Sequence, residues 1–212
     1  WKDAIIEFVQ TKNAHALRFA IEELIDHYPK PALEVLMNLL DSHDTERIIT
    51  KIGFGNTEAV PLHERPTLEL TGKELENTIQ KLKIASFIQF TLPGVPSIYY
   101  GDEIGMQGFR DPYNRKTFSK KEINEDIFNH YKALTAFRTE YKEDFKGDFN
   151  VIYENNGCLV YQRESLLCAV NMNEHTEYIE GLHGKQIFSS HKTRNHPNGL
   201  LVPANGFAAY QI

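Results

Sequence analysis

The chain has 212 residues, of which 41% are apolar and 25% are charged, a composition typical of folded globular proteins. Its formal net charge of −6 provides no basic surface of the kind that binds nucleic acid. No run of about 18 apolar residues is present, so the sequence contains no candidate membrane-spanning helix. Because the chain begins with Trp1 rather than Met, we expect the natural N-terminus and any targeting segment to lie upstream.

The first part of the chain is predicted to alternate helices with short buried strands. Residues 13–28 predict a helix, because Asn13 can cap it and apolar residues recur on one face at helical spacing. Residues 33–40, LEVLMNLL, form a mainly apolar run of strand length without alternation, which is typical of a parallel strand buried on both faces. Residues 50–70 are rich in Gly, Pro and charge and predict an irregular segment.

Two further helices and a second strand are predicted downstream. Residues 71–74 form a Thr-x-x-Glu capping box, and the helix that it opens continues through 75–88. Residues 96–101 predict a second short buried strand, followed by a loop. A second capping box at 119–122 opens a helix whose apolar face runs through 123–134.

The pattern changes near residues 141–148. Beyond this point short segments of alternating polarity are separated by turn residues, which is typical of an antiparallel sandwich. The segments predicted as strands are 149–154, 157–163, 166–171, 186–190 and 206–212. The helices and strands upstream of this point imply a parallel sheet, but two strands are too few to form one. The first part of the chain therefore predicts a piece of a larger fold.

The only two cysteines, Cys158 and Cys168, are too few to form a disulfide scaffold in a chain of this length. If both lie in one hairpin that turns near residues 164–165, Cys158 faces roughly Asn171 rather than Cys168. We therefore expect two free thiols.

Three motifs resemble segments of α-amylase-family glycoside hydrolases: NLLDSHDTERI (38–48), LPGVPSIYYGDEIGM (92–106) and DPYNR (111–115). The chain is most similar to the neopullulanase, cyclomaltodextrinase and maltogenic amylase group, over nearly its whole length. In that family the motifs lie at barrel strand seven, around strand eight and in the loop after it. The resemblance implies a fold class of α/β plus all-β. Residues 1–144 are then the C-terminal portion of a (β/α)8 TIM barrel, and residues 145–212 an antiparallel β-sandwich domain called domain C.

The resemblance also implies that the main catalytic pair lies outside this chain. The family's nucleophilic Asp follows strand four and its acid/base Glu follows strand five, whereas this chain supplies only strands seven and eight. Two stretches resemble those segments only superficially. GFRD (108–111) has adjacent Arg and Asp, where the nucleophile segment has one residue between them. GDE (101–103) belongs to the strand-eight motif.

Asp44 is the predicted catalytic residue, and His43 is its predicted partner in binding substrate. By resemblance, Asp44 holds sugar hydroxyls and distorts the ring toward the oxocarbenium-like transition state. By resemblance, His43 donates a hydrogen bond to a sugar hydroxyl at the cleavage point. The alternatives are a loop carboxylate that caps the next turn, a structural histidine, or half of a metal site. No cluster supplies further ligands for a metal, so none is predicted.

Asp111 and Arg115 are the remaining binding candidates, four positions apart in the loop after the second strand. Related enzymes use an Asp and an Arg at this spacing to bind the sugar one step beyond the cleavage point. The alternative is an ion pair that stiffens the turn at Pro112. Residues 116–120, KTFSK, depart from the commoner family pattern of Pro and Trp. The residues expected to shape the barrel mouth are Tyr99, Tyr100, Asp102 and Glu103.

The resemblance implies an enzyme that hydrolyses α-glucosidic bonds in maltodextrins, cyclodextrins or pullulan with retention and without a cofactor. Calcium occurs in the family but is not indicated by this chain. The expected partners are an α-glucan oligosaccharide, the remainder of the barrel and a second copy of the chain, with neither nucleic acid nor membrane. The family resemblance and the free cysteines favour the cytoplasm. The rival hypothesis is a non-catalytic module that binds glucans or only packs against a neighbour.

Overall fold

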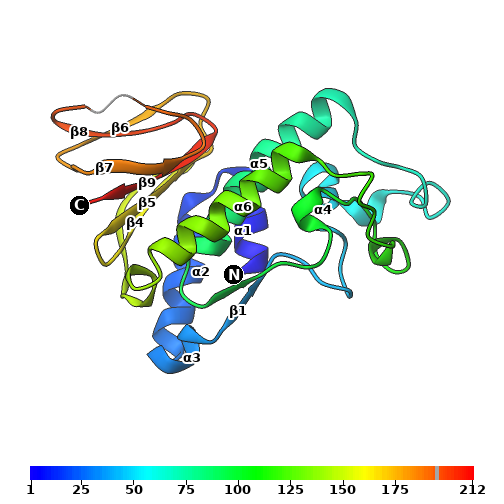
Figure 1. The fold of residues 1–212 in the computed structure, drawn as a ribbon, viewed down its shortest axis with the longest axis horizontal. Coiled ribbons are helices and arrows are strands. Elements are labelled where there is room, and N and C mark those ends of the chain that lie inside the picture. The colour runs from blue at the N-terminus through cyan, green and yellow to red at the C-terminus, as the bar shows by residue number, and fades with distance from the viewer. Residues whose placement is uncertain (194–195) are drawn as a thin grey trace.

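The computed structural model describes residues 1–193 and 196–212. Figure 1 shows the helices gathered beside a set of antiparallel strands. The α-helices are α1 (Lys2–Thr11), α2 (Ala14–His27), α3 (Lys30–Glu34), α4 (Ile48–Phe54), α5 (Gly72–Thr91) and α6 (Glu125–Glu140). The strands are β1 (Met37–Leu39), β2 (Val95–Ser97), β3 (Phe149–Asn155), β4 (Cys158–Arg163), β5 (Leu166–Asn171), β6 (Glu177–Glu180), β7 (Lys185–Ser189), β8 (Gly199–Val202) and β9 (Gly206–Gln211).

β1 and β2 form a parallel pair in which Met37 lies opposite Val95. Both strands are shorter than the predicted ranges of 33–40 and 96–101. Residues 30–34 form helix α3, so the first two residues of the predicted strand are helical. Pro31 is tolerated in this helix because N–H groups in the first turn have no partner within the helix. The pair packs against α5, which is buried along most of its C-terminal half.

Helices α1 and α4 are absent from the predicted set. α4 lies partly inside the segment predicted to be irregular, residues 50–70. Its first backbone N–H, that of Ile48, donates to the Asp41 carboxylate at 2.7 Å. This cap comes from seven residues upstream, so the pattern next to the helix does not reveal it.

The predicted helix starts are confirmed for α2 and α5 and wrong for α6. α2 begins as predicted, with the Asn13 side chain accepting a hydrogen bond from the backbone. Thr71 precedes α5 but its side chain makes no capping hydrogen bond. α6 is capped by Asn124, which accepts from two backbone N–H groups, so the predicted start at 119–122 is wrong. Asn124 is the N-cap because its short side-chain amide reaches the free backbone N–H groups of the first helical turn.

The strands after residue 148 form a five-stranded antiparallel sheet in the order β3-β4-β5-β9-β7, and a two-stranded sheet of β6 and β8. β6 and β8 are absent from the predicted strands. The predicted hairpin register is confirmed, because Cys158 lies opposite Asn171 and both thiols are free and buried. One face of the larger sheet packs on the helices and the other on β6 and β8. This layering fits the predicted sandwich.

A single hydrophobic core joins the helices to the larger sheet. Phe87 of α5 stacks on Phe207 of β9 with ring centroids 4.5 Å apart. Arg163, 1% exposed, donates from β4 to the Thr91 carbonyl at 2.7 Å. The helical part and the sheet therefore pack closely, and their division into two domains at residue 144 stays a prediction.

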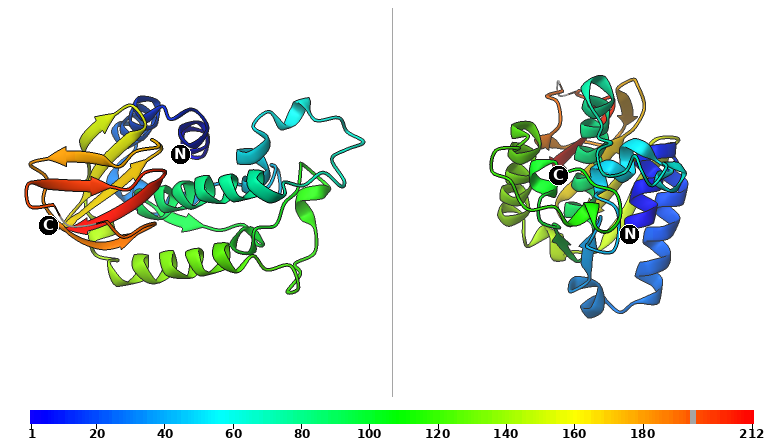
Figure 2. Two further views of the ribbon diagram at one scale, coloured as in Figure 1. Left: turned by 90° about the horizontal axis from the view of Figure 1, so that it is seen from above. Right: turned by 90° about the vertical axis from the view of Figure 1, so that its right-hand side faces the viewer.

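The pair of helices α5 and α6 sets the long dimension of the molecule. The two run side by side, with the sheet at one end and the loops of residues 55–70 and 105–120 at the other (Figure 2). Among the described residues, no helix combines the length and the apolar character that crossing a membrane requires.

Candidate functional site

The turn after β1 presents His43 and Asp44 at the surface. The turn is closed by Ser42 and Thr45, since the Ser42 N–H donates to Thr45 Oγ1 at 3.1 Å. The side chains of His43 and Asp44 are 65% and 72% exposed. His43 Nε2 lies 3.3 Å from Asp44 Oδ1, so the two polar groups face the same region of solvent.

The loop after β2 brings Asp111 and Arg115 to the same place. Arg115 Nε lies 3.2 Å from Asp111 Oδ1, and Arg115 Nη2 lies 4.0 Å from Asp44 Oδ1. The guanidinium also donates to the His43 carbonyl from Nε and Nη2, each at 3.2 Å. The four predicted residues therefore form one cluster, although 72 positions separate His43 from Arg115.

Two residues that the sequence analysis did not single out lie beneath this cluster. Arg47 and Asn114 are 1% and 0% exposed. Arg47 Nε donates to the Asn114 carbonyl at 2.8 Å, and Asn114 Nδ2 donates to the His43 carbonyl at 2.8 Å. Both residues lie within the motifs that carry the family resemblance. Their burial is the signal of a structural role, and it becomes visible only in three dimensions.

Asp41 and Asp102 form a buried carboxylate pair beside Arg47. Asp102 Oδ1 lies 3.3 Å from Arg47 Nη1. Burial raises the pKa of Asp102 well above its ordinary value, and the neighbouring Asp41 carboxylate raises it further. Burial also raises the pKa of Asp41, although hydrogen bonds and the charge of Arg47 oppose that shift. The Asp41 carboxylate therefore opposes ionisation of Asp102, and the charge of Arg47 offsets part of that cost.

Tyr99 and Tyr100 enclose the same guanidinium. The Arg47 guanidinium carbon lies 4.2 Å from the Tyr99 ring centroid and 4.6 Å from that of Tyr100. Glu103 accepts a hydrogen bond from the Gly101 N–H at 2.7 Å. These contacts hold the two tyrosines and Glu103 in place, and their role in shaping the barrel mouth stays a prediction.

Arg110, in the stretch that superficially resembles the nucleophile segment, makes an ion pair. Its Nε lies 3.2 Å from Glu46 Oε1, which also accepts a hydrogen bond from Thr57 at 2.8 Å. Burial raises the pKa of Glu46, but backbone and Thr57 hydrogen bonds and the Arg110 charge outweigh it, so the pKa is lowered overall. Glu46 is therefore ionised and connects the turn after β1 to Thr57 and Arg110.

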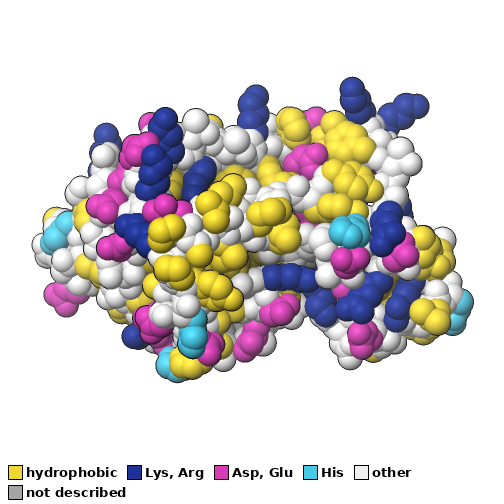
Figure 3. All heavy atoms as spheres, turned by 90° about the horizontal axis from the view of Figure 1, so that it is seen from below, with side chains coloured by type: hydrophobic (Ala, Val, Ile, Leu, Met, Phe, Trp, Pro, Cys, Tyr) yellow, Lys and Arg dark blue, Asp and Glu magenta, His cyan; other side chains and the backbone are white. Residues whose placement is uncertain are grey.

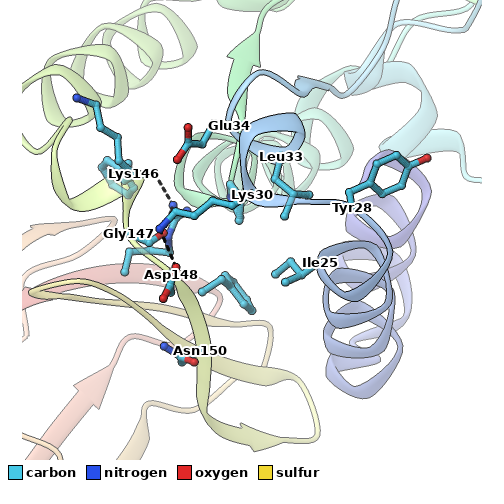
Figure 4. A pocket seen from close by; sticks show the side chains of 14 residues that line it. Ile25, Tyr28, Lys30, Leu33, Glu34, Lys146, Gly147, Asp148 and Asn150 are labelled. Atoms are coloured by element: carbon cyan, nitrogen blue, oxygen red, sulfur yellow. Dashed lines mark hydrogen bonds and ion pairs between the residues drawn. The ribbon is translucent and has the colours of Figure 1, made fainter.

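A separate cavity of about 340 Å³ lies between the α2–α3 region and the start of the sheet (Figure 4). Ile25 and Leu33 line it, and Lys30 on its wall pairs with Asp148 at 2.9 Å. None of the four predicted site residues lines this cavity, so it is not part of the cluster. In the described parts of the chain, no group of three or more His, Cys, Asp or Glu side chains is placed to hold a metal ion.

Comparison with known proteins places the chain in a family. The α-amylase catalytic-domain family matches residues 5–146. Neopullulanase 2 from Thermoactinomyces vulgaris is 37% identical over 142 residues, covering 65% of this chain and 20% of that protein. A cyclomaltodextrinase from Thermoanaerobacter pseudethanolicus is 28% identical over 211 residues, covering 95% of this chain and 33% of that protein.

Solved structures share the fold. The native Nostoc punctiforme debranching enzyme superposes with a TM-score of 0.78 and 22% identity, covering 100% of this chain and 46% of that one. The type III pullulan hydrolase from Thermococcus kodakarensis gives 0.75 and 22%, covering 100% and 35%. The chain spans no more than a third of the length of the curated relatives described above. With two thirds of its residues inside the catalytic-domain match, the chain belongs to the α-amylase family of glycoside hydrolases.

Proposed function

We propose that the chain is part of a retaining hydrolase that cleaves α-glucosidic bonds in maltodextrins, cyclodextrins or pullulan. The observation that carries the proposal is the cluster of His43, Asp44, Asp111 and Arg115. It follows the carboxyl ends of two parallel strands, where barrel enzymes place their active sites. The names of the relatives, which refer to cyclomaltodextrin and pullulan, support this substrate class.

In this proposal each residue of the cluster has a role toward the sugar. Asp44 holds hydroxyls of the distorted ring and stabilises the oxocarbenium-like transition state, and His43 donates to a hydroxyl of the same sugar. Asp111 and Arg115 bind the next sugar. The nucleophile and the acid/base come from the rest of the barrel, and the chemistry needs no cofactor because carboxyl groups perform both steps. This chain alone should therefore release no reducing sugar from maltotriose.

We further propose that β1 and β2 are strands seven and eight of the barrel, residues 1–144, and that residues 145–212 are domain C. In the described residues β1 and β2 pair only with each other, whereas every strand of a closed barrel has two neighbours. Met37 and Val95 on this pair are 60% and 50% exposed. Apolar side chains gather on the face seen from below in Figure 3, the side where Figure 1 places β1. The remainder of the barrel would cover this face.

Replacing Asp44 in the complete enzyme tests the proposed function. Asp44→Asn should lower kcat by about 100-fold or more with little change in KM, because the lost interaction is made mainly in the transition state. Asp26→Asn, which alters an exposed carboxylate on α2, is the matched control and should leave both constants unchanged. A change in KM alone would make Asp44 a ground-state binder, and unchanged kinetics would remove it from the site.

A further inference from the structure

The exposed cluster rests on a buried layer that the proposed chemistry does not use. Arg47 reaches three parts of the loops around β2. Its backbone N–H donates to the Gly108 carbonyl at 2.9 Å, and its Nε donates to the Asn114 carbonyl at 2.8 Å. Its Nη1 donates to the Tyr100 carbonyl and lies 3.3 Å from Asp102 Oδ1. One side chain thus joins the turn after β1 to the loop after β2.

Asn114 connects this layer to Asp44. Its Nδ2 donates to the carbonyl of His43 at 2.8 Å and to that of Thr45 at 2.7 Å. These are the carbonyls on either side of Asp44 in the sequence. One amide nitrogen therefore holds the carbonyls of the residues before and after Asp44, which restrains the short backbone segment that carries the exposed carboxylate.

The residue types suit this work. A guanidinium presents several donors in a fixed planar fork, so Arg47 can hold the Asn114 and Tyr100 carbonyls at once, which a lysine ammonium on a flexible stem does less well. The Asn114 amide nitrogen has two N–H groups and can bond two carbonyls. Neither side chain reaches solvent, so neither touches the sugar.

We propose that Arg47 and Asn114 are positioning residues that hold the Asp44 backbone in register with the loop carrying Asp111 and Arg115. The proposal rests on the proposed function, in which Asp44 stabilises the transition state. Arg47 acts through Asn114, and Asn114 acts through the two carbonyls beside Asp44. Displacements on the order of 1 Å in a site of this kind cost about 100-fold in rate, so the layer contributes to kcat without contacting substrate.

A double-mutant cycle in the complete enzyme tests this. The variants are Arg47→Lys, Asp44→Asn and their combination, assayed for kcat and KM on maltotriose. Arg163→Lys is the matched control, because Arg163 is also 1% exposed and also donates to backbone carbonyls, but at the junction with the sheet. Asn114→Asp, which keeps the shape and removes the two donors, is a second route should Arg47→Lys fail to fold.

We expect Arg47→Lys and Asn114→Asp to lower kcat by about 10- to 100-fold with little change in KM. In the Asp44→Asn background each should lower kcat by less than about threefold, because the group that they position is already lost. Arg163→Lys should lower the unfolding temperature and leave kcat within about twofold. Equal losses of kcat with Asp44 present and with Asp44→Asn would overturn the positioning role. A loss of kcat for Arg163→Lys as large as that for Arg47→Lys would overturn it too. An unchanged kcat for Asp44→Asn would instead refute the proposed function itself.

Discussion

Arg115 makes more contacts in the cluster than a sugar-binding residue needs. It pairs with Asp111 at 3.2 Å and also donates twice to the His43 carbonyl. Among the described residues Asp111 forms no other ion pair, so the two residues are not equivalent. Loss of Asp111 removes one side of the pair, whereas loss of Arg115 also frees the turn that carries Asp44.

Asp111→Ala in the complete enzyme should lower kcat/KM on long maltodextrins by about tenfold, the effect of one charged hydrogen bond. Arg115→Ala should lower it further and should also reduce kcat on short substrates, because the His43 carbonyl loses two donors. Steady-state kinetics on maltotriose and on longer chains separates the two effects. Unchanged kcat/KM in both variants would favour the alternative in which the ion pair only stiffens the turn.

His130 on α6 makes stability depend on pH. The pKa of His130 is lowered from 6.5 to about 3, chiefly by burial and then by the charge of Lys83, while the charge of Asp126 and a backbone hydrogen bond at Lys83 oppose the shift. Its Nε2 lies 2.8 Å from Ser86 Oγ. The unfolded chain takes up this proton near pH 6.5, but the folded chain does so only near pH 3. The unfolded state binds more protons in between, so the free energy of unfolding falls as pH drops through this window.

His130→Leu should weaken this acid sensitivity. Urea unfolding at several pH values between about 7 and 4 should give a shallower fall in the free energy of unfolding than for the original chain. His63→Leu is the control, since the His63 side chain is 82% exposed, and it should follow the original curve. Parallel curves for His130→Leu and the original chain would show that His130 carries no such linkage.

At the scale of elements, α6 shows how a helix start is chosen. The pattern at 119–122 satisfies the capping-box rule, yet the helix begins at Glu125. Asn124→Ala should therefore cost about 1 kcal/mol in the free energy of unfolding, the usual loss for a removed cap. Ser119→Ala should change it by less than about 0.5 kcal/mol. Chemical denaturation of the two variants measures both values, and equal costs would contradict the observed start.

Elements whose pattern depends on nearby residues were predictable from the sequence. The helix at 13–28, the strands of the five-stranded sheet and the facing of Cys158 by Asn171 follow from spacing and turn position. β1 was predicted too long because its ends depend on pairing with β2, which a local pattern does not contain. The cluster around Asp44 was predictable through motifs that two parallel strands bring to one edge. Arg47, by contrast, was not predictable, because arginine side chains are mostly exposed and the burial of this one is evident only from the structure.

At the scale of the whole molecule, the parallel pair of β1 and β2 has unpaired outer edges among the described residues, with Met37 and Val95 exposed. An unpaired strand edge with exposed apolar side chains favours pairing with another chain. We expect this chain, expressed without the remainder of the barrel, to associate with itself, and light scattering across a dilution series should show mass rising with concentration. Val95→Lys should move the association to about tenfold higher concentration.

Phe19→Lys is the control for this association, because Phe19 is an exposed apolar residue on α2 rather than on the parallel pair. It should leave the association unchanged. A monomer at every concentration would show that the pair satisfies its edges within the chain.

The position of β9 has a consequence for synthesis. β9 is the last strand along the described chain, yet it lies between β5 and β7, and its Phe207 stacks on Phe87 of α5. A ribosome makes α5 more than a hundred residues before its partner in this core appears. β5 and β7 cannot be joined in the sheet before β9, the strand between them, has emerged. Phe87 therefore stays without its final partner until residues 206–211 have emerged, so the nascent chain exposes apolar surface on α5 late into its synthesis.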